Sequence, residues 1–484
     1  MTAAQKRRLR LRAERVWEAA RPCPGRPTPA RTAEARAALL APPTDPDAAP
    51  ACGVVRWFAG GGVGTDPEGL ADMGGLDLLQ VDVRPEYLEW DGGTAVRWQQ
   101  SRRDDVLQQI RDHDYAQGPF KLAASVRKGF YVPGLEYDLD VGTFRRCKPE
   151  DPKSDQNRIL QVLRERFPHL RLVLLASPPC RMTSSCNTTT VRDAKQAFLQ
   201  QILHCLRGLR YALEFGKVDT VLVEESAKGT HDRRGVFVPG DDARRMLSAL
   251  NCVDDGAGDA RFGVVQLDAA DDFGGPSTRR RLLFAPHDVL ACVPARDPEA
   301  PADQEPTTGW GRVLGVPAGG ILRTVRGSWL PRVFAGCHPT DACDTFTTLP
   351  MFVYAERDDM PCPTRVGLGP VDRALCMGCR PHDPRLPRLL DLPQQLSNTL
   401  TGISFVADFY LGVLAAAMGA VGCLDGADGA AGARRAFWSV QRARRALHPA
   451  PARGRRVQRH RFLVDLHEGM TLEEYHRRLA RMHT

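Results

Sequence analysis

Residues 52–83 read CGVVRWFAGGGVGTDPEGLADMGGLDLLQVDV, and this stretch decides the fold. Its apolar residues predict a strand over 53–58 and another over 77–83, with a glycine-rich turn and a helix between them. A glycine turn that joins a strand to a helix lets backbone N–H groups come close to a ligand. The turn lacks the third glycine of a dinucleotide-binding motif. It therefore predicts a nucleotide-like cofactor site, with a plain tight turn as the alternative.

Two side chains beside this turn suit such a cofactor. Phe58 directly precedes the glycines, where an aromatic ring can lie against a flat group such as adenine. Asp82 ends the second strand, about 20 residues further on, where a carboxylate can accept hydrogen bonds from a ribose. Both positions therefore belong to the candidate cofactor site.

Strands and helices continue to alternate after this unit. The patterns predict strands over 171–176, 219–223, 262–267 and 281–285, and helices over 155–167, 191–215, 241–250 and 405–424. Such alternation is typical of a parallel sheet with helices on both faces. The sequence therefore predicts an α/β fold with a doubly wound, mostly parallel sheet.

Composition and charge restrict the class of protein. A chain of 484 residues predicts one large domain and a smaller one, and a net charge of +8 is compatible with an acidic partner such as nucleic acid. The fourteen cysteines have no regular spacing, which is typical of reduced thiols. We find no signal peptide and no apolar run of membrane-spanning length. We therefore expect a soluble, intracellular monomer without a membrane partner, in the nucleus of a eukaryote or the cytoplasm or nucleoid otherwise.

Three segments depart from the strand and helix alternation. Residues 1–50 carry ten Lys/Arg against five Asp/Glu and are expected to be disordered apart from a short helix over 5–20. Residues 288–390 are rich in Pro, Gly and Cys, which predicts a second, loop-rich domain. Residues 431–461 hold ten arginines and no acidic residue, so they form either a solvated linker or an arm that neutralises phosphates.

A cluster of soft ligands lies in the second of these segments. Seven cysteines and histidines fall within 46 positions, from Cys337 to His382. Four of them, Cys362, Cys376, Cys379 and His382, are candidates for a structural zinc site. The second half of a standard finger spacing is missing, which favours unrelated thiols in a loop-rich region over a metal site.

Residues 173–185 read VLLASPPCRMTSS and put a cysteine at the end of a buried strand. Two prolines stiffen the turn, and strand ends face the crevice in which α/β folds bind ligands. Cys180 is therefore a candidate nucleophile if Arg181 or a helix N-terminus near residue 190 lowers its pKa. Taken alone, such a thiol more often has a packing role.

Charged residues lie at the ends of two later strands. Glu224 follows the strand over 219–223, where a partly buried carboxyl can carry a proton, although such residues are often helix caps. Arg279 and Arg281 are two positions apart at the start of a strand, so we expect their side chains on one face. Two guanidinium groups on one face suit a phosphate, a carboxylate or a carbonyl.

The order of these features resembles the cytosine-5 DNA methyltransferase family. FAGGGVGTDPEGLADMGG is similar to its cofactor motif F-x-G-x-G, SPPCRMTS to its Pro-Cys nucleophile motif, VLVEES to its Glu-Asn-Val motif and STRRR to its Gln-x-Arg-x-Arg motif. TGISFVADFYLGVLAAAM, residues 401–418, is similar to the last motif, a turn and helix that return to the cofactor. The resemblance covers about 52–424, strongly at the motifs and weakly between them.

The resemblance implies a Rossmann-like catalytic domain over 51–287, a target-recognition domain over 288–390, a closing motif and helix over 391–424, and a basic linker with a short helix over 425–484. It implies S-adenosylmethionine as the cofactor, held by Phe58, Gly60, Gly62, Asp82, Pro179 and Ser404. In that arrangement Asp82 binds the ribose and Ser404 the methionine end.

The resemblance also implies a substrate and a chemistry. Cys180 attacks C6 of a cytosine flipped out of double-stranded DNA, which makes C5 nucleophilic enough to accept a methyl group. Glu224 holds the ring N3 as a proton donor, and Arg279 and Arg281 orient the base carbonyl and Glu224. The alternatives are an RNA cytosine-5 methyltransferase, a catalytically weak nucleic-acid-binding relative, and an amino-methyltransferase. The last has an aromatic residue after Pro-Pro, where this chain has Cys180.

Several positions depart from the family's pattern. They are Arg181 (for Gln), Glu225-Ser226 (for Asn-Val), Ser277 (for Gln) and Ile403 (for Asn). Phe58 and Cys180 are 122 positions apart, which predicts an insertion within 84–150. Asp140, inside that insertion, is the candidate for binding the adenine.

Overall fold

The computed structural model describes residues 29–45, 48–124, 136–138, 143–145, 155–178, 192–226, 229–231, 237–251, 260–297, 299–300, 305, 321–326, 351–356, 364–403, 405–424, 428–447 and 463–465. Its centre is an eight-stranded sheet in the order β11-β12-β8-β7-β1-β2-β4-β3. The strands are β1 Cys52–Trp57, β2 Gly75–Asp82, β3 Val96–Arg97, β4 Phe120–Ala123, β7 Arg171–Ala176, β8 Thr220–Ser226, β11 Phe262–Asp268 and β12 Arg280–Pro286. All neighbours pair in parallel except β12, which is antiparallel to β8 and β11.

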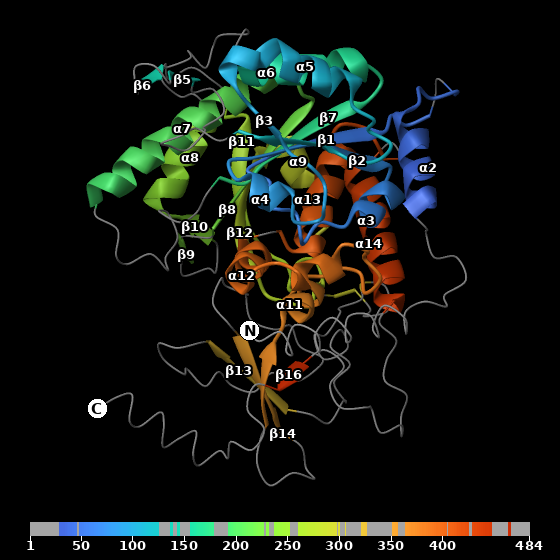
Figure 1. Cartoon of the computed structure of the whole chain (residues 1–484), viewed down its shortest axis with the longest axis vertical. Helices are drawn as coiled ribbons and strands as arrows, with labels where there is room; N and C mark the ends of the chain where they lie inside the picture. Colours follow the sequence, from blue (N-terminus) through green and yellow to red (C-terminus); the bar gives the residue numbers. More distant parts are fainter. Residues whose placement is uncertain are drawn as a thin grey trace.

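Helices cover both faces of this sheet (Figure 1). One face packs against α5 Arg103–Asp112, α6 Asp155–Arg166, α7 Arg192–Glu214 and α8 Asp241–Asn251. The other packs against α3 Pro67–Asp72, α9 His287–Ala291, α13 Ala407–Ala420 and α14 Gly429–Ala446. Each face of the sheet has its own apolar core, so the predicted doubly wound, Rossmann-like α/β fold is confirmed.

The strand order brings the ends of several strands to one edge. β1 lies between β2 and β7, so the connections run in opposite directions from β1, and ligands bind at the carboxyl edge of such a switch point. In the parallel ladders Trp57 pairs with Val81 and with Ala176. Because β12 is antiparallel to β8, its first residues lie at the edge where β8 ends, with Arg281 opposite Ser226.

Helix α13 is the core of the second face. Every residue from Ala407 to Gly419 is buried, which explains why its sequence is apolar all round. By length and hydropathy Gln394–Ala420 is the one stretch of the described chain that would pass as a membrane span, and 94% of its window is buried inside the protein. The sequence-based statement that no apolar run reaches that length is therefore wrong, because this run fills the core.

Part of the basic N-terminal segment is a helix. Residues Pro29–Leu40 form α2, and the buried Arg36 donates hydrogen bonds to the carbonyls of Tyr115 and Asp77, at 3.0 and 2.8 Å. The prediction of disorder over 1–50 is therefore wrong for this stretch. The helix expected over 5–20 lies outside the described residues.

Part of the arginine-rich C-terminal segment is also a helix. α14 buries Phe437, Trp438, Val440 and, among its polar residues, Gln441 and Arg444. The interpretation as a solvated linker is therefore wrong for residues 429–446, and phosphate binding by the exposed Arg435 and Arg442 stays a prediction. The sequence alone does not distinguish an arginine that pairs with a buried acidic residue from one that faces water. The short helix expected near the C-terminus lies outside the described residues.

The region predicted as a second domain divides into two parts. β13 Ile321–Arg326, β14 Met351–Glu356, β15 Thr364–Leu368 and β16 Leu463–Asp465 form a separate antiparallel sheet, below the main one in Figure 1. α11 Pro370–Cys376 and η2 Leu386–Leu390 instead pack against Val63 of the glycine turn and Trp90. The predicted boundary at 390 is therefore wrong, since the chain returns to the main domain from about residue 370.

Short elements complete the described chain. They are α4 Pro85–Leu88, η1 Gln100–Arg102, the hairpin β5 Glu136–Asp138 with β6 Thr143–Arg145 inside the predicted insertion, the hairpin β9 Gly229–His231 with β10 Phe237–Pro239, and α12 Gln394–Ile403.

The assignment of α14 to the core can be tested with one truncation. Phe437→Ala is expected to lower the free energy of unfolding by about 3–5 kcal/mol, because Phe437 is fully buried against Phe273 and α13. The exposed Ser439 on the same helix provides the control, and Ser439→Ala should change stability by less than about 0.5 kcal/mol. Equal, small effects of both substitutions in urea unfolding would show that α14 is a solvated arm after all.

Candidate functional site

The glycine turn after β1 has a left-handed backbone over several residues. The φ angles of Gly60, Gly61 and Gly62 are 58°, 82° and 62°, and Phe58 has φ 58°. Phe58 is the one residue other than glycine with positive φ in the described part of the chain. A half-buried aromatic residue held in this region stores backbone strain, and such strain is concentrated at functional sites.

Asp82 closes the turn from the end of β2. Its carboxylate accepts hydrogen bonds from the N–H groups of Gly60, at 2.9 Å, and Arg84, at 3.1 Å. Burial raises the pKa of Asp82, and the backbone N–H groups of Gly60, Arg84 and Val83 oppose that rise. The predicted ribose-binding residue thus also holds the two strand ends together.

Close packing explains why the turn consists of glycines. A Cβ at Gly61 would lie 2.5 Å from Leu400 of α12, and a Cβ at Gly64 would overlap the carbonyl of Phe405, just before α13. A Cβ at Gly62 would lie 2.8 Å from Nη1 of Arg56. The closing segment, more than 300 positions away in sequence, therefore packs directly on the glycine turn.

A buried ion pair that the sequence analysis missed lies beneath Gly62. Arg56, 1% exposed, pairs through Nη2 with Asp77 Oδ2 at 3.2 Å, and the hydroxyl of Tyr410 donates to the other oxygen of Asp77 at 2.6 Å. The Arg56 guanidinium also lies 5.6 Å from the centre of the Tyr410 ring. A charged residue inside an otherwise apolar strand was the sequence signal for this cluster.

Glu224 contacts two other strand ends. The Ser177 hydroxyl, directly after β7, donates a short hydrogen bond to Oε2 of Glu224, and Nε of Arg281 lies 2.5 Å from Oε1. Glu224 is buried and faces Leu283 across the β8–β12 ladder, so Arg281 reaches it diagonally. The N–H of Ser177 donates to the carbonyl of Trp57 at 3.1 Å, which joins this group to β1.

The two arginines of the Arg-x-Arg pair have different partners. Arg279 precedes β12, is buried, and donates from Nη1 to the carbonyl of Gly402 in α12 at 3.2 Å. Arg281 holds Glu224. One arginine therefore connects this edge to the closing segment, and the other orients the strand-end acid.

Five residues of the predicted cofactor and catalytic sites lie outside the described residues. They are Asp140, Pro179, Cys180, Arg181 and Ser404. Their roles as the adenine ligand, cofactor contacts, nucleophile and neighbour of the nucleophile remain predictions.

The candidate zinc ligands have other partners. The Cys379 thiol donates to the carbonyl of Val63 at 2.9 Å, and burial raises its pKa. His382 Nε2 lies 3.2 Å from Oε2 of Glu68, and Cys376 is a buried free thiol at the end of α11. Nowhere in the described ranges do three or more Cys, His, Asp or Glu side chains gather as metal ligands would. The zinc alternative therefore has no support from Cys376, Cys379 and His382, and Cys362 lies outside the described residues.

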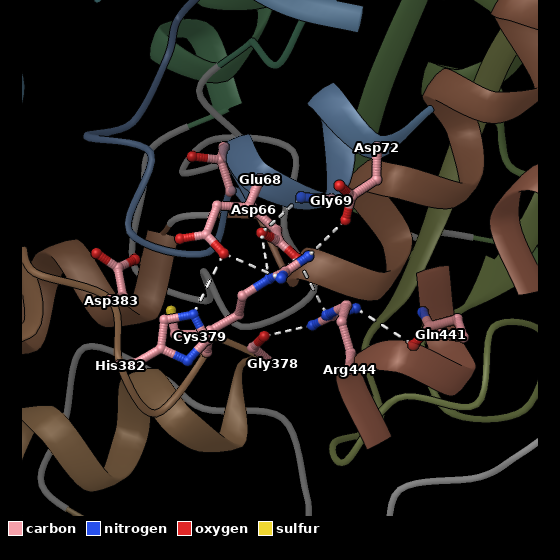
Figure 2. A network of polar contacts seen from close by, with 12 residues as sticks. Asp66, Glu68, Gly69, Asp72, Gly378, Cys379, His382, Asp383, Gln441 and Arg444 are labelled. Atoms are coloured by element: carbon pink, nitrogen blue, oxygen red, sulfur yellow. Dashed lines mark hydrogen bonds and ion pairs between the residues drawn. The ribbon is translucent and has the colours of Figure 1, made fainter. Parts of the chain in front are cut away.

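Figure 2 shows the polar network to which Cys379 and His382 are adjacent. Asp66 is the N-cap of α3, where its side chain accepts from Gly69 N–H at 3.0 Å. Arg380 Nε lies 2.9 and 3.0 Å from its two oxygens, and Arg444 Nε lies 3.1 Å from Oδ2. Burial opposes ionisation of Asp66, but the guanidinium groups of Arg380 and Arg444 and the N–H of Gly69 together more than offset it, so the pKa of Asp66 is lowered.

Comparison with known proteins adds a likeness of fold. No family model and no curated protein matches the chain. Among solved structures, a putative DNA modification methyltransferase encoded within a prophage (E. coli) aligns with 75% of this chain and 98% of its own, at 11% identity and a TM-score of 0.36. The S. pombe Dnmt2 methyltransferase aligns with 76% and 98%, at 11% identity and a TM-score of 0.32. At these values the likeness assigns no activity to this chain.

The requirement for glycine at position 62 can be measured against a matched control. Gly62 and Gly216 have φ of 62° and 64°, but a Cβ at Gly216 would meet nothing within 4 Å. Gly216→Ala should lower stability by about 1–2 kcal/mol for the backbone conformation alone. Gly62→Ala should lose about 1–3 kcal/mol more, because the methyl group displaces Arg56. Equal losses in urea unfolding would mean that the guanidinium does not support the turn.

Proposed function

We propose that this protein transfers a methyl group to C5 of cytosine in double-stranded DNA, with S-adenosylmethionine as methyl donor. The observation that carries the proposal is the buried Glu224 carboxyl group held between Ser177 and Arg281 at the carboxyl edge of the sheet. Ser177 begins the sequence Ser-Pro-Pro-Cys, so the acid contacts both the arginine and the turn that leads to the candidate nucleophile.

The residues around the glycine turn fit the cofactor. The left-handed backbone of Gly60, Gly61 and Gly62 is a conformation that glycine adopts without steric cost, as a tight turn next to a ligand requires. Asp82 receives three backbone N–H groups, and a carboxylate has about four acceptor sites, which leaves one for a ribose hydroxyl. In this proposal Phe58, Gly60, Gly62 and Pro179 line the cofactor site and Ser404 meets the methionine end. The cofactor supplies an electrophilic methyl group on a sulfonium centre.

The chemistry on the base rests on the chain's own residues. The Cys180 thiolate bonds to C6 of a flipped cytosine while the Glu224 carboxyl group, in its protonated form, gives its proton to N3 and becomes the carboxylate that pairs with Arg281. The electron pair at C5 then takes the methyl group. Loss of the C5 proton to solvent and expulsion of the Cys180 thiolate then restore the C5–C6 double bond, and N3 returns its proton to Glu224, which leaves neutral 5-methylcytosine. Cys180 is three positions after Ser177, a span of at most about 11 Å, which supports a thiol within reach of the same base.

A methyl-transfer assay tests the reaction class. With labelled S-adenosylmethionine and cytosine-containing duplex DNA, the wild-type chain should form 5-methylcytosine, and Cys180→Ala should form none. Cys186→Ala, six positions further on, is the matched control and should retain activity. DNA with 5-fluorocytosine at the target should trap a covalent adduct only when Cys180 is present, because fluorine cannot leave as a proton does. Transfer to tRNA alone, or N4-methylcytosine as product, would overturn the proposal.

The acid can be tested separately from the nucleophile. Glu224→Gln is expected to lower kcat by about 10²- to 10⁴-fold, because the amide has no acidic proton for N3. Its neighbour Glu225 points to the opposite face of β8, so Glu225→Gln should leave kcat within about threefold of wild type. Binding of S-adenosylmethionine should change little in either variant. An unchanged kcat in Glu224→Gln would remove Glu224 from the mechanism.

A further inference from the structure

The carbonyl groups of the glycine turn are bound by side chains from other parts of the chain. Trp90 Nε1 donates to the carbonyl of Gly61, and Cys379 Sγ donates to the carbonyl of Val63 at 2.9 Å. Arg385 donates from Nη1 to the carbonyl of Gly62 at 3.4 Å and from Nη2 to the carbonyl of Thr65 at 3.0 Å. Three of these four contacts come from residues 379–385, which follow α11. We call residues 379–385 the clamp.

The clamp also holds the helix that follows the turn. Arg380 binds the cap residue Asp66 and reaches Glu68 at 3.0 Å and Asp72 at 3.3 Å, both in α3. His382, at the edge of the same group in Figure 2, contacts Glu68. One segment therefore grips the turn by its carbonyls and the helix by its acidic side chains.

The Arg385 guanidinium is held in place by contacts within the chain. Its Nη2 lies 2.7 Å from Oδ2 of Asp383, and the group lies 5.6 Å from the centre of the Trp90 ring. Trp90 itself donates to Gly61. The fixed charge of Asp383 and the planar ring leave the remaining N–H groups of Arg385 directed at Gly62 and Thr65.

Helix α14 holds the clamp from the other side. Arg444 donates from Nη2 to the carbonyl of Gly378, next to the clamp, and pairs with Asp66 and with Asp408 of α13. Gln441 donates to Asp408 at 2.7 Å. Arg444 thus connects the clamp, the cap of α3 and the core helix α13.

We propose that Arg385, supported by Cys379, Arg380 and Arg444, is a positioning residue that holds the cofactor turn in its binding conformation. The inference rests on the proposed function, since it takes the turn as the S-adenosylmethionine site. Arg385 touches neither the cofactor nor the base in this assignment. It acts by holding the carbonyl side of Gly62 and Thr65, so that the left-handed backbone of the turn is kept ready for the ligand.

The test compares Arg385→Gln with Arg388→Gln in the full chain. Arg388 is an exposed arginine three positions further along, so its substitution removes the same charge without touching the turn. Hydrogen exchange of a peptide covering residues 59–73 is measured first, without cofactor. Exchange should be about tenfold faster in Arg385→Gln and unchanged in Arg388→Gln. Arg385→Lys keeps the charge but not the forked geometry and should give an intermediate rate.

Cofactor binding is then measured by calorimetry with S-adenosylmethionine alone. The Kd should rise about tenfold in Arg385→Gln, equivalent to about 1.4 kcal/mol, whereas kcat at saturating cofactor stays within about threefold. Asp383→Asn removes the charge that fixes Arg385 but keeps Arg385 itself, so it should also raise the Kd for S-adenosylmethionine. This variant replaces Arg385→Gln in the test if Arg385→Gln does not fold.

The outcomes separate this inference from the proposed function. A wild-type chain that does not bind S-adenosylmethionine overturns the proposed function and the cofactor role of the clamp together. A second outcome is that the wild type binds S-adenosylmethionine while Arg385→Gln leaves both the Kd and the rate of hydrogen exchange unchanged. That result overturns the positioning role of Arg385 and leaves the proposed function standing. A parallel fall of kcat, cofactor affinity and thermal midpoint would assign Arg385 a general structural role and overturn the positioning role.

Discussion

The Asp66 carboxylate connects parts of the chain that lie more than 300 positions apart. It caps α3 and pairs with Arg380 and with Arg444 of α14. Removing a carboxylate from water is costly, and only close guanidinium groups and backbone N–H donors can offset that cost. Because Asp66 is buried, three parts of the chain must pack together. They are α3, α14 and the segment that follows α11. The position of the glycine turn depends on that arrangement, because the turn ends at Asp66.

A second constraint is β12, the one antiparallel strand of the eight-stranded sheet. In an all-parallel sheet Arg281 would start its strand at the edge opposite to the end of β8. Reversal of β12 brings the amino end of one strand to the carboxyl end of another, so Arg281 meets Glu224. The same reversal brings Arg279 to the carbonyl of Gly402. Two arginines from one short motif thereby connect the strand-end acid to the closing segment.

Most of the main sheet was predictable because its strands are short apolar runs bounded by glycine, proline or charge. The strand at 171–176 was predicted with the bounds that the structure has, and the helix at 191–215 differs from Arg192–Glu214 by one residue at each end. The predictions failed for charged residues that are buried in the core. Arg36 and Arg444 belong to stretches predicted as disordered or solvated, yet both are buried with partners. Composition describes how polar a segment is, but it does not show whether the charged side chains of that segment have buried partners.

The same distinction applies to the candidate site, where some features could be predicted from the sequence and others could not. The sequence by itself determined the α/β alternation, the glycine turn, Asp82 and the strand-end positions of Ser177 and Glu224, because each depends on a local pattern of apolar runs and turns. It could not determine that Cys379 and His382 face Val63 and Glu68 instead of a metal, or that Arg385 holds the glycine turn. Those contacts join residues more than 300 positions apart. Only the packing of α11 on the glycine turn and of α13 and α14 on the sheet decided them, because burial, not sequence spacing, selects the partner of a buried polar group.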